Sequence, residues 1–336
     1  MTEPVLDVRD MRVWYSGPGG PVRAVDGVTF TLRPGEVLGL VGESGCGKST
    51  LGRGLLGLTP RGSAVDGAVT FDGRDLLTLG RRDRERLRGA GMGLIFQEPM
   101  TRLDPLMRVS DHFDEALKTH AKELNKKERE TRALEALRAL GIPPTRYRNY
   151  PHEFSGGMRQ RIMIALALAL RPKFIVADEP TTALDVLVEA QILRILAEIR
   201  ERFSPAILLI THNLGIVAEA CDRVAVMYAG RIVEQGPVRE VFAAPKHPYT
   251  QALLRSTISL TTQELHSIPG SPPDLVAPPD GCRFNPRCPD AMRVCVRQRP
   301  PSFGSHATEC WLLDESLTAD EKAPLDREEV SVADEA

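Results

Sequence analysis

The strongest chemical signal in the chain is a glycine-rich segment that ends in lysine and serine. Residues 42–49 read Gly-Glu-Ser-Gly-Cys-Gly-Lys-Ser, which matches the G-x-x-x-x-G-K-S pattern of a phosphate-binding loop. Glycines let the backbone turn tightly enough to point successive N–H groups at one anion, and the helix that follows adds the positive end of its dipole. We expect Lys48 to reach the β- and γ-phosphates of a nucleotide and the Ser49 hydroxyl to bind Mg²⁺. The predicted nucleotide contacts of this segment are Gly42, Ser44, Gly45, Cys46, Gly47, Lys48, Ser49 and Thr50.

Two adjacent carboxylates follow an apolar run at residues 174–177, in the order Asp178-Glu179. A strand that ends in carboxylates can deliver them beside a phosphate loop, where Asp178 would bind Mg²⁺ and Glu179 would polarise an attacking water. His212 also follows a predicted strand and could donate a hydrogen bond to a γ-phosphate oxygen. Gln97 ends another strand, and its amide oxygen could bind Mg²⁺ or the water. Considered alone, His212 is as consistent with a structural role as with a catalytic one.

A second anion-binding element is predicted at Ser155-Gly156-Gly157, where a helix begins. Serine is a good N-cap, and the glycines leave backbone N–H groups exposed. One chain has no second phosphate for this turn. The economical interpretation is a dimer in which each Ser-Gly-Gly turn faces the nucleotide of the other subunit.

These residues must be positioned by strands that alternate with helices. Apolar runs predict strands, and longer periodic stretches at 111–140, 158–170 and 184–203 predict helices. Such alternation is typical of an α/β protein with a parallel, mostly buried sheet. The predicted strands lie at residues 37–41, 93–96, 174–177, 206–210 and 224–227, and a hairpin is predicted over Ala229-Gly230.

Composition excludes several classes of function. The formal charge of −2 over 336 residues gives no electrostatic reason to expect nucleic acid as a partner. No apolar run is long enough to span a membrane, and the first residues lack the features of a signal peptide. We therefore expect a cytosolic chain, with any membrane role exercised through a partner.

The composition changes after about residue 240. Four of the six cysteines cluster there, at Cys282, Cys288, Cys295 and Cys310, in a proline-rich segment. In a reducing compartment such a cluster is more typical of a metal site than of disulfides. The gaps exceed the two to four residues within zinc ligand pairs, which favours an iron–sulfur cluster over zinc or free thiols. The acidic residues 314–336 are predicted to be disordered.

Taken together and in order, these motifs resemble an ABC-transporter ATPase subunit. The match covers about residues 5–240 and includes Gln97, Ser155 to Met158, Ala177 to Pro180, Asp185 and His212. The resemblance implies that Asp185 lies in the loop joining two subunits and that Tyr15 stacks on adenine. It also implies a P-loop NTPase (RecA-like) α/β core, with an N-terminal antiparallel β subdomain and an inserted α-helical subdomain.

Further segments are similar to the oligopeptide/dipeptide importer ATPases. These segments are residues 95–101, 150–155, 178–185, 247–250 and 281–289. The narrower resemblance implies a peripheral subunit on the cytoplasmic face of the bacterial inner membrane. It pairs there with a second, related ATPase, two permease subunits and an extracytoplasmic solute-binding protein, and its four cysteines hold a 4Fe–4S cluster. The implied domains are a nucleotide-binding domain at 1–245 (helical part about 98–172), a C-terminal extension at 246–313 and the acidic tail.

Some residues depart from the family pattern, and some alternatives stay open. Met158 replaces a glutamine, Asn213 stands where aspartate is usual, and Arg102 and Asp104 stand where small or amide residues are usual. No catalytic position is lost. The cargo could instead be nickel, glutathione or an oligosaccharide. A soluble ABC ATPase of DNA repair, chromosome organisation or translation is disfavoured, because the chain has one cassette and no sustained heptads.

Overall fold

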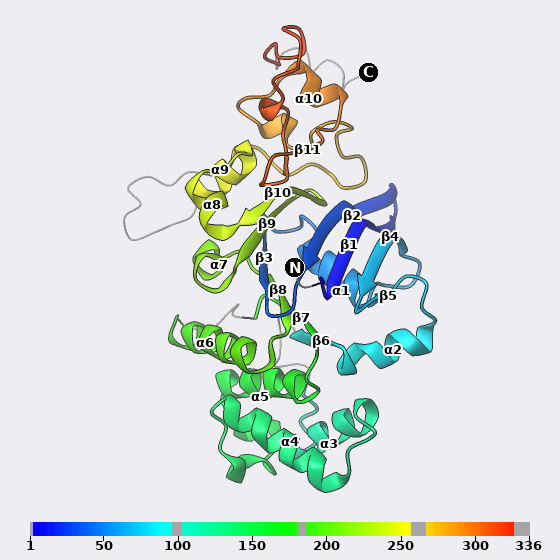
Figure 1. Cartoon of the computed structure of the whole chain (residues 1–336), viewed down its shortest axis with the longest axis vertical. Helices are drawn as coiled ribbons and strands as arrows, with labels where there is room; N and C mark the ends of the chain where they lie inside the picture. Colours follow the sequence, from blue (N-terminus) through cyan, green and yellow to red (C-terminus); the bar gives the residue numbers. More distant parts are fainter. Residues whose placement is uncertain (1–2, 96–102, 181–185, 257–266, 326–336) are drawn as a thin grey trace.

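A six-stranded sheet forms the centre of the protein. The computed structural model describes residues 3–95, 103–180, 186–256 and 267–325, without the side chains of residues 186–188, 191 and 192 (Figure 1). The strand order is β10-β9-β3-β8-β7-β6, and all neighbours are parallel except β9 and β10. The strands are β3 (Val37–Val41), β6 (Met92–Ile95), β7 (Phe174–Asp178), β8 (Ala206–Ile210), β9 (Arg223–Tyr228) and β10 (Arg231–Pro237).

Burial explains why these apolar runs form strands. Every residue of β3, β7 and β8 is buried, as expected for parallel strands that are covered on both faces. The predicted hairpin is confirmed, since Tyr228 pairs with Arg231 across Ala229 and Gly230. Both turn residues have positive φ angles, 44° and 84°, as a tight hairpin of this kind requires. The predicted α/β class is therefore confirmed.

A second sheet, of four antiparallel strands in the order β2-β1-β4-β5, lies beside the first (Figure 1). Helix α1 (Lys48–Leu55) packs between the two sheets, and its Leu51 and Leu55 share one apolar core with Val8 and Val13 of β1. This second sheet consists of β1 (Leu6–Gly17), β2 (Gly20–Leu32), β4 (Ala64–Phe71) and β5 (Arg74–Asp75).

A group of helices lies at one end of the molecule, next to β6 and β7 (Figure 1). The stretch at 111–140, predicted as continuously helical, forms two helices. Asn125 ends the break between them by capping the second helix, and its side chain accepts a hydrogen bond from the N–H of Glu128 (3.1 Å). The helices of this group are α3 (Val109–His120), α4 (Lys126–Ala139) and α5 (Gly156–Ala169). Three further helices lie closer to the two sheets: α2 (Arg81–Ala90), α6 (Val186–Phe203) and α7 (Leu214–Ala220).

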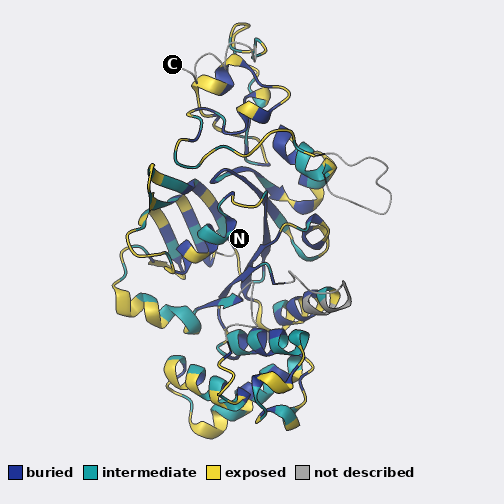
Figure 2. Cartoon of the chain, turned by 180° about the vertical axis from the view of Figure 1, so that it is seen from behind, coloured by how far each residue is buried: buried dark blue, intermediate teal, exposed yellow. Residues whose placement is uncertain are grey.

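The C-terminal part lies at the opposite end and packs onto β9 and β10 (Figure 1). An aromatic cluster forms this contact: Tyr228 of β9, Tyr249 and Phe284 have ring centroids 4.5–5.4 Å apart. All three side chains are buried (Figure 2 shows burial along the chain). The elements are α8 (Val238–Ala243), α9 (Pro248–Arg255), α10 (Arg293–Arg297), β11 (Ser302–Phe303) and β12 (Thr308–Glu309).

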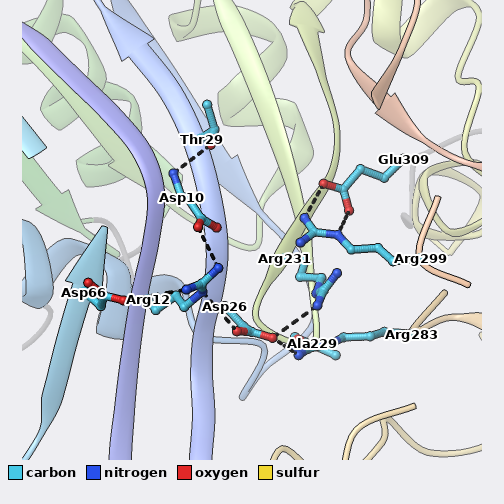
Figure 3. Close-up of polar contacts among 10 residues, drawn as sticks. All are labelled: Asp10, Arg12, Asp26, Thr29, Asp66, Ala229, Arg231, Arg283, Arg299 and Glu309. Carbon is cyan, nitrogen blue, oxygen red and sulfur yellow. Dashed lines mark hydrogen bonds and ion pairs between the residues drawn. The ribbon is translucent and has the colours of Figure 1, made fainter. Parts of the chain in front are cut away.

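A buried network of charges also joins this C-terminal part to the second sheet (Figure 3). Asp26 of β2 forms ion pairs with Arg231 of β10 (3.2 Å) and with Arg283, which in addition donates to the carbonyl oxygen of Ala229. Burial alone would raise the pKa of Asp26, but Arg283 and Arg231 outweigh it and hold that pKa below its usual value. A second pair, Arg299 with Glu309 (2.7 Å), lies within the C-terminal part.

The prediction of disorder is wrong for the first half of the acidic tail. Residues 314–325 fold back onto α10: the N–H of Arg293 donates to Ala323, and that of Leu325 to Ala291. Leu317 packs near Trp311, and Arg293 pairs with Asp320 (2.6 Å). The prediction used the low apolar content of the whole segment. It failed because a few leucines and acids in the segment make specific contacts with the rest of the C-terminal part. Residues 326–336 lie outside the described part of the chain. No helix in the described residues is long and apolar enough to cross a membrane.

The aromatic contact predicts a measurable stability effect. Phe284 is 1% exposed, and replacing it with alanine should lower the free energy of unfolding by about 3–5 kcal/mol through lost burial and a cavity. Denaturant unfolding of Phe284→Ala measures this. The control is Leu106→Ala at a residue that is 85% exposed, where a change within about 0.5 kcal/mol is expected. An equal effect of the two substitutions would contradict the importance of this contact.

Candidate functional site

The glycine-rich segment forms a compact loop between β3 and α1. Gly42 and Gly47 have φ angles of 152° and 107°, a region that other residues rarely adopt. A Cβ atom would lie 2.1 Å from the carbonyl oxygen of Met227 at Gly42, and 2.0 Å from that of Ala24 at Gly47. Glycine is therefore required at both positions, because strands β9 and β2 approach the loop too closely for any side chain.

Lys48 lies within the loop that precedes it. The side chain is buried, and its Nζ donates to the carbonyl oxygens of Gly42 (2.8 Å) and Glu43 (2.9 Å). These two bonds hold the ammonium group at the mouth of the loop, where Ser44 and Gly45 are exposed. A positive charge and the N-terminus of α1 thus face the same region, which favours an anion.

The sheet brings the first predicted carboxylate to the start of α1. The Ser49 hydroxyl donates to Oδ1 of Asp178 over 2.8 Å, although the two residues are 129 positions apart in the chain. Asp178 is the last residue of β7 and is buried. Burial raises its pKa, and the hydrogen bond from Ser49 partly opposes this effect. A hydroxyl and a carboxylate in contact provide the oxygen donors that Mg²⁺ prefers.

Glu179 and His212 meet next to this pair. Asp178 lies opposite Ile210 in the parallel ladder of β7 and β8, so the residues after both strands emerge at one edge of the sheet. Nδ1 of His212 is 3.4 Å from Oε1 of Glu179. The N–H of Glu179 donates to Ile210 (2.9 Å), and its φ angle is 47°, a left-handed conformation that costs about 1 kcal/mol. Such a strained residue at a sheet edge is typical of a functional site.

The Ser-Gly-Gly turn starts α5, as predicted. The Ser155 side chain caps the helix by accepting a hydrogen bond from the N–H of Met158 (3.4 Å). Helix α5 packs against α3, α4 and β6, whereas α1 packs against β1, β2, β7 and β8. The exposed Ser155 and the phosphate loop therefore belong to different parts of the chain.

Sequence reasoning missed a link between this helix and the carboxylates. Gln160 is buried, and its Nε2 donates to the carbonyl oxygen of Pro180, the residue after Glu179. Gln160 lies one helical turn after Gly156, so helix spacing shows that it shares a face with the turn. No signal in the sequence shows that this face meets Pro180.

The remaining predicted contacts have different outcomes. Tyr15 lies near the end of β1, opposite Val22, and is partly exposed. Gln97 and Asp185 lie outside the described residues. Asn213, which departs from the family pattern, caps α7: its Oδ1 accepts from the N–H of Gly215 (3.0 Å) and of Ile216 (3.4 Å). Asparagine and aspartate are equally good N-caps, which explains why this departure is tolerated.

The four clustered cysteines share one buried region of the C-terminal part. The N–H of Cys282 donates to the carbonyl oxygen of Cys295 (2.8 Å), and Cys288, Cys295 and Cys310 are buried. Burial raises the pKa of Cys288 to about 12 and that of Cys310 to about 11. Burial also raises the pKa of Cys282, with further contributions from the other three thiols.

Backbone N–H groups point at these sulfur atoms. Cys282, Cys288 and Cys310 each receive a hydrogen bond from the residue two positions later, respectively Phe284, Asp290 and Leu312. Such bonds stabilise thiolates and are common where cysteine binds a metal. Among the described residues, however, no group of three or more His, Cys, Asp or Glu side chains is close enough to hold a metal ion in this conformation.

Comparisons with known proteins identify the family of the chain. The ABC transporter family model matches residues 25–182, and the model of the oligopeptide/dipeptide transporter C-terminal region matches residues 233–295. The chain is 49% identical to the oligopeptide transport ATP-binding protein OppD of Salmonella typhimurium, covering 88% of this chain and 89% of that protein. It is 47% identical to the dipeptide transport ATP-binding protein DppD of Bacillus subtilis, covering 93% and 96%.

Solved structures show the same fold. The cbiO1 protein of Clostridium perfringens, part of the ABC transporter complex cbiONQ, has a TM-score of 0.63 and 30% identity over 72% of this chain and 92% of that one. A dimeric ATP-binding cassette in a post-hydrolysis state, bound to ADP and Pi, has a TM-score of 0.62 and 26% identity over 70% and 99%. By fold, motifs and sequence identity, the chain belongs to the ABC transporter family, as an ATPase subunit of its oligopeptide/dipeptide group.

Proposed function

We propose that this ATPase powers the import of di- or oligopeptides at the cytoplasmic face of the bacterial cell membrane. The cargo is supported by the relatives named above, which are oligopeptide and dipeptide transport ATP-binding proteins, and by the match of the C-terminal region. The observation that carries the catalytic part is the 2.8 Å hydrogen bond between Ser49 and Asp178. It joins the phosphate loop to the strand that supplies the carboxylates.

The proposed roles follow from this geometry. Lys48 would exchange the loop carbonyls for phosphate oxygens. Ser49 and Asp178 would hold Mg²⁺, which would neutralise phosphate charge. Glu179 accepts a proton from the attacking water, and His212, in contact with Glu179, donates a hydrogen bond to the γ-phosphate. We assign adenine stacking to Tyr15. Gln97 would contact Mg²⁺ or the water, and Asp185 would contact the second subunit.

We propose that the catalytic site is completed by a second, related ATPase subunit. Ser155 is exposed and Gly156 and Gly157 are half-buried at the start of α5, away from the elements that hold α1. The similar cassette bound to ADP and Pi is dimeric, which supports this arrangement. Two permeases and a solute-binding protein would complete the importer. In this scheme α3–α5 are the inserted helical subdomain of a nucleotide-binding domain at 1–245, and residues 246–313 are the importer-specific extension.

We further propose that Cys282, Cys288, Cys295 and Cys310 hold a 4Fe–4S cluster. Four cysteines in one buried region fit the ligand set of such a cluster, and the N–H groups directed at three of the sulfur atoms fit its charge. Bound iron would require the thiols to deprotonate and move closer together. The cluster would act as a clip within the proline-rich extension.

Glu179→Gln should separate binding from hydrolysis. The amide cannot accept the proton, so kcat for ATP should fall by about 10²–10⁴-fold, while the Kd for MgATP stays close to that of the unchanged protein. Phosphate release by the assembled transporter and MgATP titration measure the two effects. Glu198→Gln, an exposed glutamate on α6, is the control. Near-normal hydrolysis by Glu179→Gln would refute the role of Glu179.

Ser155→Arg should block the completed site but leave the single subunit intact. The bulky side chain would fill the space for the partner's nucleotide, so hydrolysis by the assembled transporter should fall at least about tenfold. MgATP binding by this chain alone should not change. Ser316→Arg, at an exposed serine of the C-terminal part, is the matched control. Unchanged transporter activity with Ser155→Arg would contradict the shared site.

The cluster is tested by chemical analysis of protein purified without oxygen. Equal amounts of iron and acid-labile sulfide are expected, and Cys282→Ser should remove both. Cys221→Ser is the control, because Cys221 lies in the nucleotide-binding part beside Val217. Zinc in place of iron, or thiols without metal, would overturn this proposal without affecting the nucleotide site.

Peptide cargo is the remaining element to test. Neighbouring genes for two permeases and a solute-binding protein with a peptide-binding cleft are expected. A binding protein selective for nickel, glutathione or an oligosaccharide would replace the peptide assignment and keep the ATPase. Recovery of ribosomes or DNA in place of permeases would favour a soluble ABC ATPase.

A further inference from the structure

Glu43, the second residue of the phosphate loop, is held by contacts to all of its polar groups. Its N–H donates to the hydroxyl oxygen of Tyr249 (2.9 Å), and its carbonyl oxygen accepts from Nζ of Lys48 (2.9 Å). Its carboxylate forms a two-pronged ion pair with Arg287 (2.6 and 3.0 Å). Tyr249 and Arg287 both belong to the C-terminal extension, so two segments more than 200 positions away anchor one residue of the loop.

Arg287 uses every donor that a guanidinium group possesses. Besides its two bonds to Glu43, Nε donates to Pro269 (2.8 Å), Nη1 to the hydroxyl of Tyr228 (3.3 Å) and Nη2 to Ile268 (3.1 Å). The side chain is 4% exposed. A guanidinium group held this way is rigid, and a lysine could not reproduce its planar set of five bonds. Arg287 is therefore a fixed anchor and Glu43 is the group that it holds.

The charge of Glu43 explains why an anchor is needed. A carboxylate within an anion-binding loop repels the phosphates that the loop must bind. The bidentate pair with Arg287 neutralises that charge and fixes the carboxylate to a buried group of the C-terminal extension. The hydrogen bond from the N–H of Glu43 to Tyr249 holds the backbone at the same point.

We propose that Arg287 is a positioning residue for nucleotide binding. It holds and neutralises Glu43, so that the phosphate loop keeps the backbone conformation and the positive electrostatic potential that bind an anion. Tyr249 supports the same residue through the backbone. This inference rests on the proposed nucleotide site and deepens it: the C-terminal extension takes part in ATP binding without touching ATP. Because Arg287 directly precedes Cys288, the cysteine region and the phosphate loop are mechanically connected.

The test measures binding of MgADP to the full chain by calorimetry. Arg287→Gln leaves the carboxylate of Glu43 unpaired, so the Kd should rise about tenfold. Adding Glu43→Gln to this variant removes the unpaired charge. The Kd of the double variant should be lower than that of Arg287→Gln by about threefold or more. Arg299→Gln is the matched control, because Arg299 also pairs with a glutamate within the extension, Glu309, away from the loop. Its Kd should equal that of the unchanged protein.

Restoration by the second substitution is a readout that loss of folding cannot produce. If Arg287→Gln does not fold, MgADP binding is measured for Tyr249→Phe instead. This substitution deletes only one hydroxyl group and should raise the Kd about threefold or more. The inference is overturned if Arg287→Gln binds MgADP within about twofold of the unchanged protein, or if Glu43→Gln restores nothing. Absence of MgADP binding by the unchanged protein would instead overturn the nucleotide site itself.

Discussion

The contact between Ser49 and Asp178 is the constraint on which the site depends. The two residues are 129 positions apart in the chain. They meet because β3, β8 and β7 are neighbouring parallel strands whose carboxyl ends share one edge of the sheet. Every residue of these three strands is buried, so a shift in register would misplace close-packed side chains on both faces of the sheet.

The same edge explains the arrangement of the other functional groups. Glu179 follows directly after β7, and His212 is the second residue after β8. The register that aligns Asp178 with Ile210 therefore also brings their side chains to within 3.4 Å. Gln160 connects the helix of the Ser-Gly-Gly turn to Pro180. A movement of α5 would therefore reach the residue after Glu179 through one buried hydrogen bond.

The C-terminal extension is joined to the nucleotide-binding part by three sets of contacts. Tyr249 and Phe284 pack against Tyr228, Arg283 forms an ion pair with Asp26, and Arg287 pairs with Glu43. These contacts reach β9, β2 and the phosphate loop, respectively. Removing one partner of a buried ion pair is costly, because the other charge stays buried and unpaired. The extension therefore packs directly against the phosphate loop.

Local features of the sequence determined much of the fold and of the candidate site. Glycines at 42 and 47, the buried apolar runs, the Ser155 cap and the carboxylates after β7 were predictable, because backbone geometry and burial act over a few residues. Only the tertiary structure decided the break at Asn125, the folded residues 314–325 and the partners of Gln160 and Glu43. Each of these depends on which surfaces meet across the fold. Periodicity and spacing within a single segment do not reveal these contacts, because the contact energy arises only when distant parts of the chain are brought together.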